Sequence, residues 1–229
     1  NLCVIEADKR DRWILKSADY GKSNIIYGAE NVEKIVKDVR ALVQKAQEVG
    51  VKRANIHILA SSSAAKMNNF QLVSKSLSDS KLNIMEIDPK MEAKYALEAT
   101  LPAEFMQEAF LADIGSGNTK LSWIEGKDTV SIETHGSKYF LENKKDTTIF
   151  REVRDAVLKV PKSKRQLCFL LGGIVYEFSQ QHEKQPINRY IVMKEPDYYT
   201  AGDDKLKAGK VVYNSLYLPG TYSYIFDSE

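Results

Sequence analysis

The sequence predicts an α/β fold in which helices flank a mixed β-sheet. Apolar residues recur at helical spacing from Val32 to Val49, and Gly50 follows where a left-handed C-terminal cap is expected. Short alternating segments such as 54–60 lie between the helical ones, as strands would. Crossover helices join some of these strands and tight turns join others, so parallel and antiparallel pairing are both expected.

The first part of the chain alternates between strands and helices. Segments 2–7 and 13–17 flank a charged turn and are typical of a hairpin. Asp88 can cap a helix and Pro89 fits its first turn, which places Glu92 in that turn or just after it. The other expected elements here are a helix over 32–49, a strand over 54–60, a helix around 70–77 and a strand over 82–87.

The second part of the chain continues the alternation, and its periodicity weakens beyond Pro186. The expected elements are two strands within 110–126, a strand over 130–134, a helix over about 148–159, a strand over 167–171 ending in Gly172 and Gly173, a helix over 175–181, a strand over 189–193 and a helix over 203–216.

Composition narrows the class of protein. The 229 residues include 33 Lys and Arg against 31 Asp and Glu, without a long block of one charge, so we expect no nucleic-acid partner. No apolar run approaches the roughly 20 residues of a membrane span. Cys3 and Cys168 lie among apolar residues, which predicts buried thiols and a cytoplasmic protein. The sequence begins within a strand-like segment without an initiator methionine and stops without capping or tail composition, so we expect a piece of a longer chain.

The segment from Asp113 to Thr119 interrupts a strand pair with an aspartate, two glycines and small polar residues. Glycine reaches positive φ at no steric cost, so such a turn can direct several backbone N–H groups at one phosphate. Asp113 could then hold Mg²⁺ beside the phosphoryl oxygens. A plain hairpin turn explains the same residues equally well, and both interpretations stay open at this point.

Residues 113–121, Asp-Ile-Gly-Ser-Gly-Asn-Thr-Lys-Leu, resemble the second phosphate loop of the actin, Hsp70 and sugar-kinase superfamily. The most similar form is Asp-Ile-Gly-Gly-Gly-Ser-Thr-Glu-Leu, from the exopolyphosphatase/guanosine pentaphosphate phosphohydrolase family. Further segments resemble motifs of that family in the same order, over about residues 1–180. They are Ile58-Leu-Ala-Ser-Ser-Ser-Ala-Ala, Asn83-Ile-Met-Glu-Ile-Asp-Pro-Lys-Met-Glu-Ala-Lys, Thr134-His-Gly-Ser and Leu170-Leu-Gly-Gly.

This resemblance implies two ribonuclease-H-like domains, over residues 1–108 and 109–229, and Mg²⁺-assisted attack of water on a terminal phosphoryl group. The substrate class would be polyphosphate or a guanosine polyphosphate. The implied roles are Glu92 as the base that orients water, Asp113 as the metal ligand, Gly115, Ser116, Gly117, Asn118, Thr119, Gly136 and Ser137 as phosphate-binding residues, and Gly172 and Gly173 at the nucleotide or phosphate edge.

The chain also departs from the family pattern. Met91 stands at the first glutamate of the paired motif, Lys94 at its arginine, and Lys120 at an acidic position, while the family's first phosphate loop would precede Asn1. Lys120 adds a positive charge that favours phosphate binding and removes a metal or water contact.

Two alternatives to the hydrolase therefore stay open, a non-catalytic phosphate-binding or nucleotide-binding protein and a small-molecule kinase. For Glu92, the alternative to a catalytic role is an acidic residue favoured near a helix N-terminus. His135 is a further candidate for phosphate contact, and a homodimer is left open.

Overall fold

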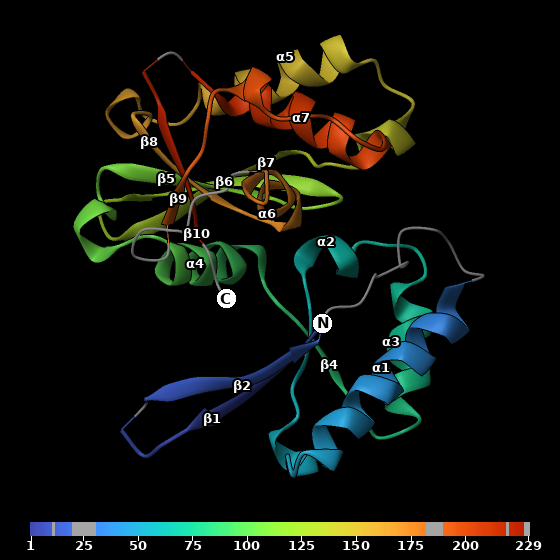
Figure 1. Cartoon of the computed structure of the whole chain (residues 1–229). Coiled ribbons are helices and arrows are strands. Elements are labelled where there is room, and N and C mark those ends of the chain that lie inside the picture. The colour runs from blue at the N-terminus through green and yellow to red at the C-terminus, as the bar shows by residue number, and fades with distance from the viewer. Residues whose placement is uncertain (11, 20–30, 182–189, 219, 227–229) are drawn as a thin grey trace. The chain divides into compact units, whose positions relative to one another are not determined.

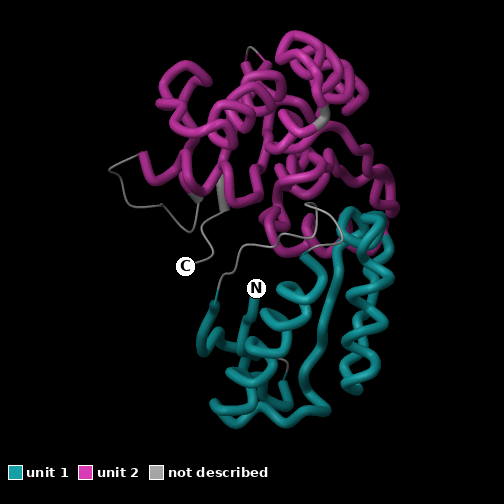
Figure 2. The backbone as a smooth tube through the Cα atoms, turned by 90° about the vertical axis from the view of Figure 1, so that its right-hand side faces the viewer, with its two compact units in different colours: residues 1–88 teal, residues 89–229 magenta. Residues whose placement is uncertain are grey.

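A computed structural model describes residues 1–10, 12–19, 31–181, 190–218 and 220–226. The chain divides into two compact units, residues 1–88 and 89–229 (Figure 2). The predicted boundary follows residue 108 instead. The two boundaries differ because helix α4 (Pro89–Thr100) packs on the sheet of the second unit. The residues after α4 form that sheet.

The first unit contains a hairpin and a pair of helices packed beside a short parallel sheet. Helix α1 ends as the sequence predicts, because Gly50 adopts a φ of +91° just after it. The elements are β1 (Leu2–Ala7), β2 (Trp13–Asp19), α1 (Val32–Glu48), η3 (Arg53–Asn55), β3 (Ile58–Ala60), α2 (Ser62–Ala65), α3 (Phe70–Ser78) and β4 (Ile84–Glu86).

Strand β3 is shorter than the predicted strand over 54–60. Residues Arg53–Asn55 form a 3₁₀ turn instead. The Arg53 guanidinium donates hydrogen bonds to the carbonyl oxygens of Ser80 (2.7 Å) and Lys81 (3.2 Å), which ties this turn to the loop before β4. The alternating sequence pattern over 54–60 is therefore longer than the strand, because its first residues do not pair in the sheet.

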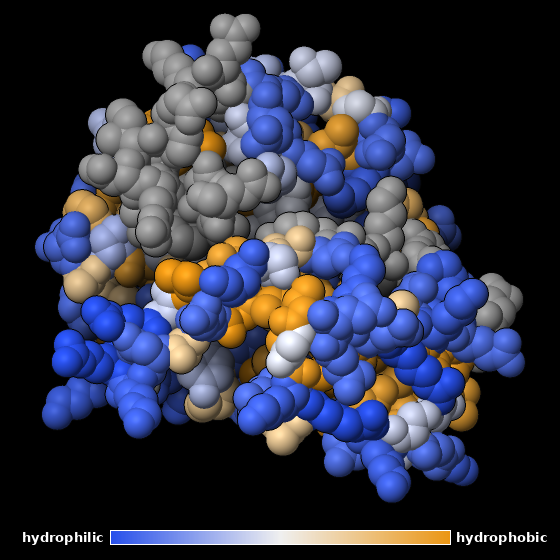
Figure 3. Space-filling model, turned by 60° about the horizontal axis from the view of Figure 1, so that its bottom comes forward, coloured by the Kyte–Doolittle hydropathy of each residue, from blue (hydrophilic) through white to orange (hydrophobic). Residues whose placement is uncertain are grey.

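Large apolar side chains remain exposed on the β1–β2 hairpin. Ile5, Trp13, Ile14 and Leu15 are 43% to 64% exposed. In the space-filling view, apolar patches lie between hydrophilic side chains (Figure 3). Cys3 is exposed too, so the prediction of a buried thiol was wrong there, because its strand belongs to a two-stranded sheet with little cover.

The second unit is built on a six-stranded mixed sheet with the order β7-β6-β5-β8-β10-β9. The first three strands pair antiparallel, β5, β8 and β10 pair parallel, and β9 closes the edge antiparallel to β10. The predicted mixed sheet flanked by helices is thereby confirmed. The strands are β5 (Ala109–Ile114), β6 (Asn118–Glu125), β7 (Asp128–His135), β8 (Leu167–Leu171), β9 (Tyr190–Val192) and β10 (Tyr222–Phe226).

Helices cover both faces of this sheet (Figure 1). Helices α5 (Asp146–Val157) and α7 (Asp204–Leu216) lie on one face and α4 on the other, while α6 (Gly173–Ser179) follows β8 directly. The described part of the chain contains no helix that is long and apolar enough to cross a bilayer. Cys168 is buried in the sheet as predicted, and this burial raises the pKa of its thiol.

Strand β10 is absent from the predicted elements, although it occupies the interior of the sheet between β8 and β9. Its Tyr224 ring stacks on Phe169 of β8, with ring centroids 5.6 Å apart. This contact packs an aromatic side chain of β10 against its neighbouring strand in the sheet.

The turn from β8 into α6 requires glycine at residue 172. Gly172 adopts a φ of +124°, and a Cβ there would lie 2.3 Å from the Ile114 carbonyl oxygen. The next residue, Gly173, has no atom within 4 Å of an added Cβ. The end of β8 is thus held against the end of β5 by a contact that only glycine allows.

We predict that Gly172→Ala lowers the free energy of unfolding by at least about 2 kcal/mol, because it combines backbone strain with a steric clash. Gly173→Ala is the matched control and should change it by less than about 0.5 kcal/mol. Urea denaturation of both variants checks this. Equal stabilities of the two variants would contradict the described approach of Gly172 to Ile114.

Candidate functional site

Alternation along β5 places Asp113 on the face of the sheet that α4 covers. Successive side chains of a strand point to opposite faces, so Asp113 shares a face with Ala109 and Leu111. Those two residues pack in the core that includes Leu97 of α4, whereas Phe110 packs in the core on the opposite face. Asp113 therefore lies at the turn end of the α4-covered face.

Lys120 of β6 lies on this same face. It is the direct cross-strand partner of Asp113, and Ile124, four residues further along β6, packs in the core beneath α4. Directly opposite residues of an antiparallel pair have Cβ atoms about 5 Å apart. The strand pairing thus brings an ammonium group next to the Asp113 carboxylate.

Glu92 reaches this pair from the first turn of α4. Residues 92, 96 and 100 share one side of the helix, and Ala96 and Thr100 face the sheet. The Lys120 Nζ lies 2.5 Å from Glu92 Oε2, and the two side chains are 5% and 20% exposed. Two strands and one helix of the second unit therefore bring Glu92, Lys120 and Asp113 together.

The electrostatic balance of this cluster shows in Asp113. Loss of hydration on burial raises the pKa of its carboxyl to about 6, against a usual value of 3.8. The nearby Lys120 ammonium opposes this increase, and the Glu92 carboxylate adds to it. The pKa of Asp113 therefore responds to both charges of the Lys120–Glu92 ion pair.

The turn between β5 and β6 is a tight hairpin. The Gly115 amide donates to the Asn118 carbonyl oxygen over 3.0 Å, with Ser116 and Gly117 exposed at its tip. Neither Gly115 nor Gly117 adopts a positive φ, so the conformational argument made from the sequence was wrong for both. Gly115 is needed for another reason, because a Cβ there would lie 2.9 Å from the Asn118 carbonyl oxygen.

Residues 136–138, which follow β7, dock on this turn. The amides of Ser137 and Lys138 donate to the carbonyl oxygens of Gly115 and Ser116, both over 2.9 Å. A Cβ on Gly136 would lie 2.6 Å from the Gly115 carbonyl oxygen, so the two backbones are in direct contact. The turn and the segment after β7, far apart in sequence, form one backbone cluster.

No family model matches the sequence, and no curated protein matches it either. Similarity appears in solved structures. An exopolyphosphatase from Cytophaga hutchinsonii superposes with a TM-score of 0.69 and 14% identity, over 98% of this chain and 89% of that one. The type II variant of the Aquifex aeolicus Ppx/GppA phosphatase gives a TM-score of 0.64 and 13% identity, over 98% and 90%.

The chain has the exopolyphosphatase fold. An exopolyphosphatase-like protein, with a TM-score of 0.59 and 11% identity over 95% of this chain and 85% of that one, agrees with this assignment. The ribonuclease-H-like, actin-type fold class predicted from the sequence is thereby confirmed.

Within the exopolyphosphatase fold, three of the predicted phosphate-binding residues have internal partners. The Ser137 hydroxyl donates to the Gly115 carbonyl oxygen over 3.3 Å, in addition to its amide bond. The Thr119 hydroxyl is buried and donates to the His135 carbonyl oxygen over 2.8 Å. Gly136 is fixed by its backbone contact. In this conformation, these three residues support the turn.

The remaining predicted residues lie at or near the surface of the same cluster. Ser116, Gly117 and Gly173 are exposed, while Gly115, Asn118 and Gly172 are partly buried. The backbone contact between Gly172 and Ile114 brings the start of α6 to the end of β5. Phosphate contact by any of the nine predicted residues stays a prediction.

The ion pair between Lys120 and Glu92 was not predicted from the sequence. Two patterns in the sequence indicate it, because strand alternation places Lys120 on the same face as Asp113 and helical spacing places Glu92 on the same side of its helix as Ala96. The side chain of His135 is not part of the cluster of Glu92, Lys120 and Asp113. Its Nε2 lies 2.5 Å from Glu152 Oε2 on α5, and this hydrogen bond lowers the pKa of Glu152, with a smaller contribution from the hydrogen bond of Lys144.

The donor set does not fit the Mg²⁺ ion that the sequence assigns to Asp113. Mg²⁺ sites in proteins use one or two carboxylates plus water and phosphate oxygens, so two carboxylates would be enough in number. The charge is the obstacle, because Lys120 already binds Glu92 and lies beside Asp113. The Lys120 ammonium would repel a divalent cation bound to these carboxylates.

Nor does any group of three or more His, Cys, Asp or Glu side chains in the described ranges have the arrangement of a metal site. Mg²⁺ at Asp113 therefore stays a prediction from the sequence.

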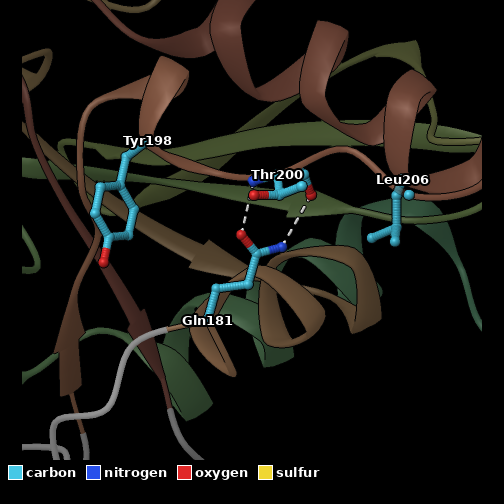
Figure 4. A pocket seen from close by; sticks show the side chains of 5 residues that line it. Gln181, Tyr198, Thr200 and Leu206 are labelled. Carbon is cyan, nitrogen blue, oxygen red and sulfur yellow. Dashed lines mark hydrogen bonds between the residues drawn. The ribbon is translucent and has the colours of Figure 1, made fainter.

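A surface hollow of about 580 Å³ lies elsewhere in the second unit (Figure 4). Gln181, Tyr198, Thr200, Gly202 and Leu206 line it. The Gln181 side-chain amide accepts from the Thr200 amide over 2.8 Å and donates to the Thr200 carbonyl oxygen over 3.0 Å. Both polar groups of the Gln181 side chain therefore form hydrogen bonds to the backbone of Thr200.

We predict that Asp113→Asn changes the pH dependence of stability. The pKa of Asp113 is raised in the folded state, so its proton stabilises the fold below about pH 4, and that contribution is lost as the pH rises through about 6. Relative to wild type, the variant should gain about 2 kcal/mol between pH 4 and pH 7. Urea denaturation across this range checks the gain, with Asp155→Asn, an exposed change on α5, as control. Parallel wild-type and Asp113→Asn curves would contradict the desolvation of Asp113.

Proposed function

We propose that this chain is a phosphohydrolase that releases terminal phosphate from polyphosphate or a guanosine polyphosphate. The observation that supports this most directly is the meeting of Glu92 and Asp113 beside the β5–β6 turn. The solved structures that share the fold include an exopolyphosphatase and a Ppx/GppA phosphatase, which makes phosphate chains the first substrate class to test.

The proposed reaction needs little covalent chemistry from the protein. Glu92 accepts a proton from the attacking water, whose oxygen bonds to the terminal phosphorus. The bond from phosphorus to the bridging oxygen breaks, and the departing chain keeps that electron pair. Catalysis then depends on positioning and on positive charge near the phosphoryl oxygens, and the cluster supplies that charge as Lys120.

A second candidate function is phosphate or nucleotide binding without turnover. The ion pair between Lys120 and Glu92 favours it, because a carboxylate oxygen that accepts a hydrogen bond from an ammonium is a poorer acceptor for a water proton. The same turn would bind the anion in both cases, so binding alone does not separate the two candidates.

We predict that Glu92→Gln lowers phosphate release from polyphosphate at least about 100-fold, because general-base catalysis contributes 10² to 10⁴ in rate. Affinity for inorganic phosphate should not decrease. Glu98→Gln is the matched control on the same helix, since Glu98 is 56% exposed and pairs only weakly with Lys94. Release is measured colorimetrically with and without MgCl₂, and affinity by calorimetry.

The outcomes separate the candidates. Release by wild type and Glu98→Gln but not by Glu92→Gln supports the hydrolase. Phosphate binding without release by wild type supports the binding protein. Equal release by wild type and Glu92→Gln removes Glu92 from the reaction, and absence of both binding and release removes the proposed site. A homodimer and a cytoplasmic location stay predictions from the sequence.

A further inference from the structure

We propose that Lys120 takes the place of a divalent cation in this site, so that a phosphate group binds to its ammonium without Mg²⁺. This inference rests on the proposed phosphate site and adds to it the nature of the positive charge. It goes against the Mg²⁺ dependence that the sequence resemblance implies.

The position of Lys120 supports this role. The residue is two positions after Asn118, directly across from Asp113, so it lies at the turn end of the strand pair. Its side chain is 5% exposed, and its ammonium binds the Glu92 carboxylate and also acts electrostatically on Asp113. A metal ion would coordinate these same carboxylates. The ammonium already neutralises part of their charge, as a bound cation would.

The position of Glu92 also allows the Lys120 ammonium to exchange this carboxylate for a bound anion. Glu92 is 20% exposed, so the ion pair has one side open to a small anion. A lysine has a flexible four-carbon stem and a compact charge, so its ammonium can move from a carboxylate to a phosphate oxygen without movement of the backbone. Ser116 and Gly117 are exposed at the tip of the adjacent turn.

This exchange explains why Glu92, the proposed base, is held in an ion pair. Before the anion binds, Lys120 holds Glu92. Once the ammonium has turned to a phosphate oxygen, Glu92 loses the hydrogen bond from Lys120, which makes its carboxylate a better acceptor for a water proton. Binding of the correct anion would thereby prepare the base, and the Glu92 carboxylate would compete with the ligand for the ammonium.

The test measures the affinity of inorganic phosphate by calorimetry in EDTA and in MgCl₂, using the full chain. Wild type should bind equally well in both buffers. Glu92→Gln should bind at least as tightly as wild type, because the competing carboxylate is gone. The double variant Glu92→Gln with Lys120→Met should bind at least about tenfold more weakly than Glu92→Gln, the effect of one lost charge-assisted hydrogen bond.

The double variant removes the two charges of the ion pair together, so no uncompensated charge of that pair is left buried. Lys127→Met is the control for general loss of positive charge, because Lys127 is exposed in the turn between β6 and β7, and it should bind as wild type does. The comparison of wild type in EDTA and MgCl₂ does not depend on any variant folding correctly.

Three results would overturn the inference. Wild-type binding that appears only with MgCl₂ would return the positive charge to a metal ion and leave the proposed phosphate site intact. Equal affinity of Glu92→Gln and the double variant in EDTA would remove Lys120 from the ligand. Absence of phosphate binding in both buffers would end the proposed phosphate site and this inference together.

Discussion

The ion pair between Lys120 and Glu92 is the interaction on which the site depends. Both side chains lie largely out of water between a helix and a sheet, where a charge without a partner is costly. Both charges of the pair act on the carboxyl of Asp113, so the three side chains form one electrostatic unit. Removal of any one changes the charge balance of the other two, which constrains both stability and ligand binding.

Close backbone contacts hold this unit in place. Gly115, Gly136 and Gly172 each bring a turn against another strand end at distances that leave no room for a side chain. The ends of β5, β6, β7 and β8 therefore meet as a rigid backbone cluster. The charged side chains Asp113 and Lys120 come from β5 and β6, and Glu92 comes to them from α4, which packs on that face of the sheet.

Much of this architecture could be predicted from the sequence. The hairpin, the helix over 32–49, the strand over 167–171 and the strand–turn–strand around Asp113 follow from local periodicity and turn chemistry. Strand β10 could not, because its place in the sheet depends on pairing with β8, some fifty residues away. The shortening of β3 had the same origin, since Arg53 is bound to a distant loop.

The site shows the same division. The family resemblance implied that Glu92 and Asp113 would serve one site, and strand register determined that Lys120 would join them. The roles of Ser137 and Thr119 were not predictable, because a hydroxyl suited to phosphate is equally suited to a backbone carbonyl oxygen. Only the fold determines which acceptor such a hydroxyl meets.

Whether Lys120 and Glu92 bind each other in the folded chain can be measured by a double-mutant cycle, with free energies of unfolding for wild type, Lys120→Met, Glu92→Gln and the double variant. We expect a coupling energy of about 1 to 3 kcal/mol, with Lys120→Met less stable than the double variant. A coupling energy below about 0.3 kcal/mol would show that the two side chains act independently, against the ion pair.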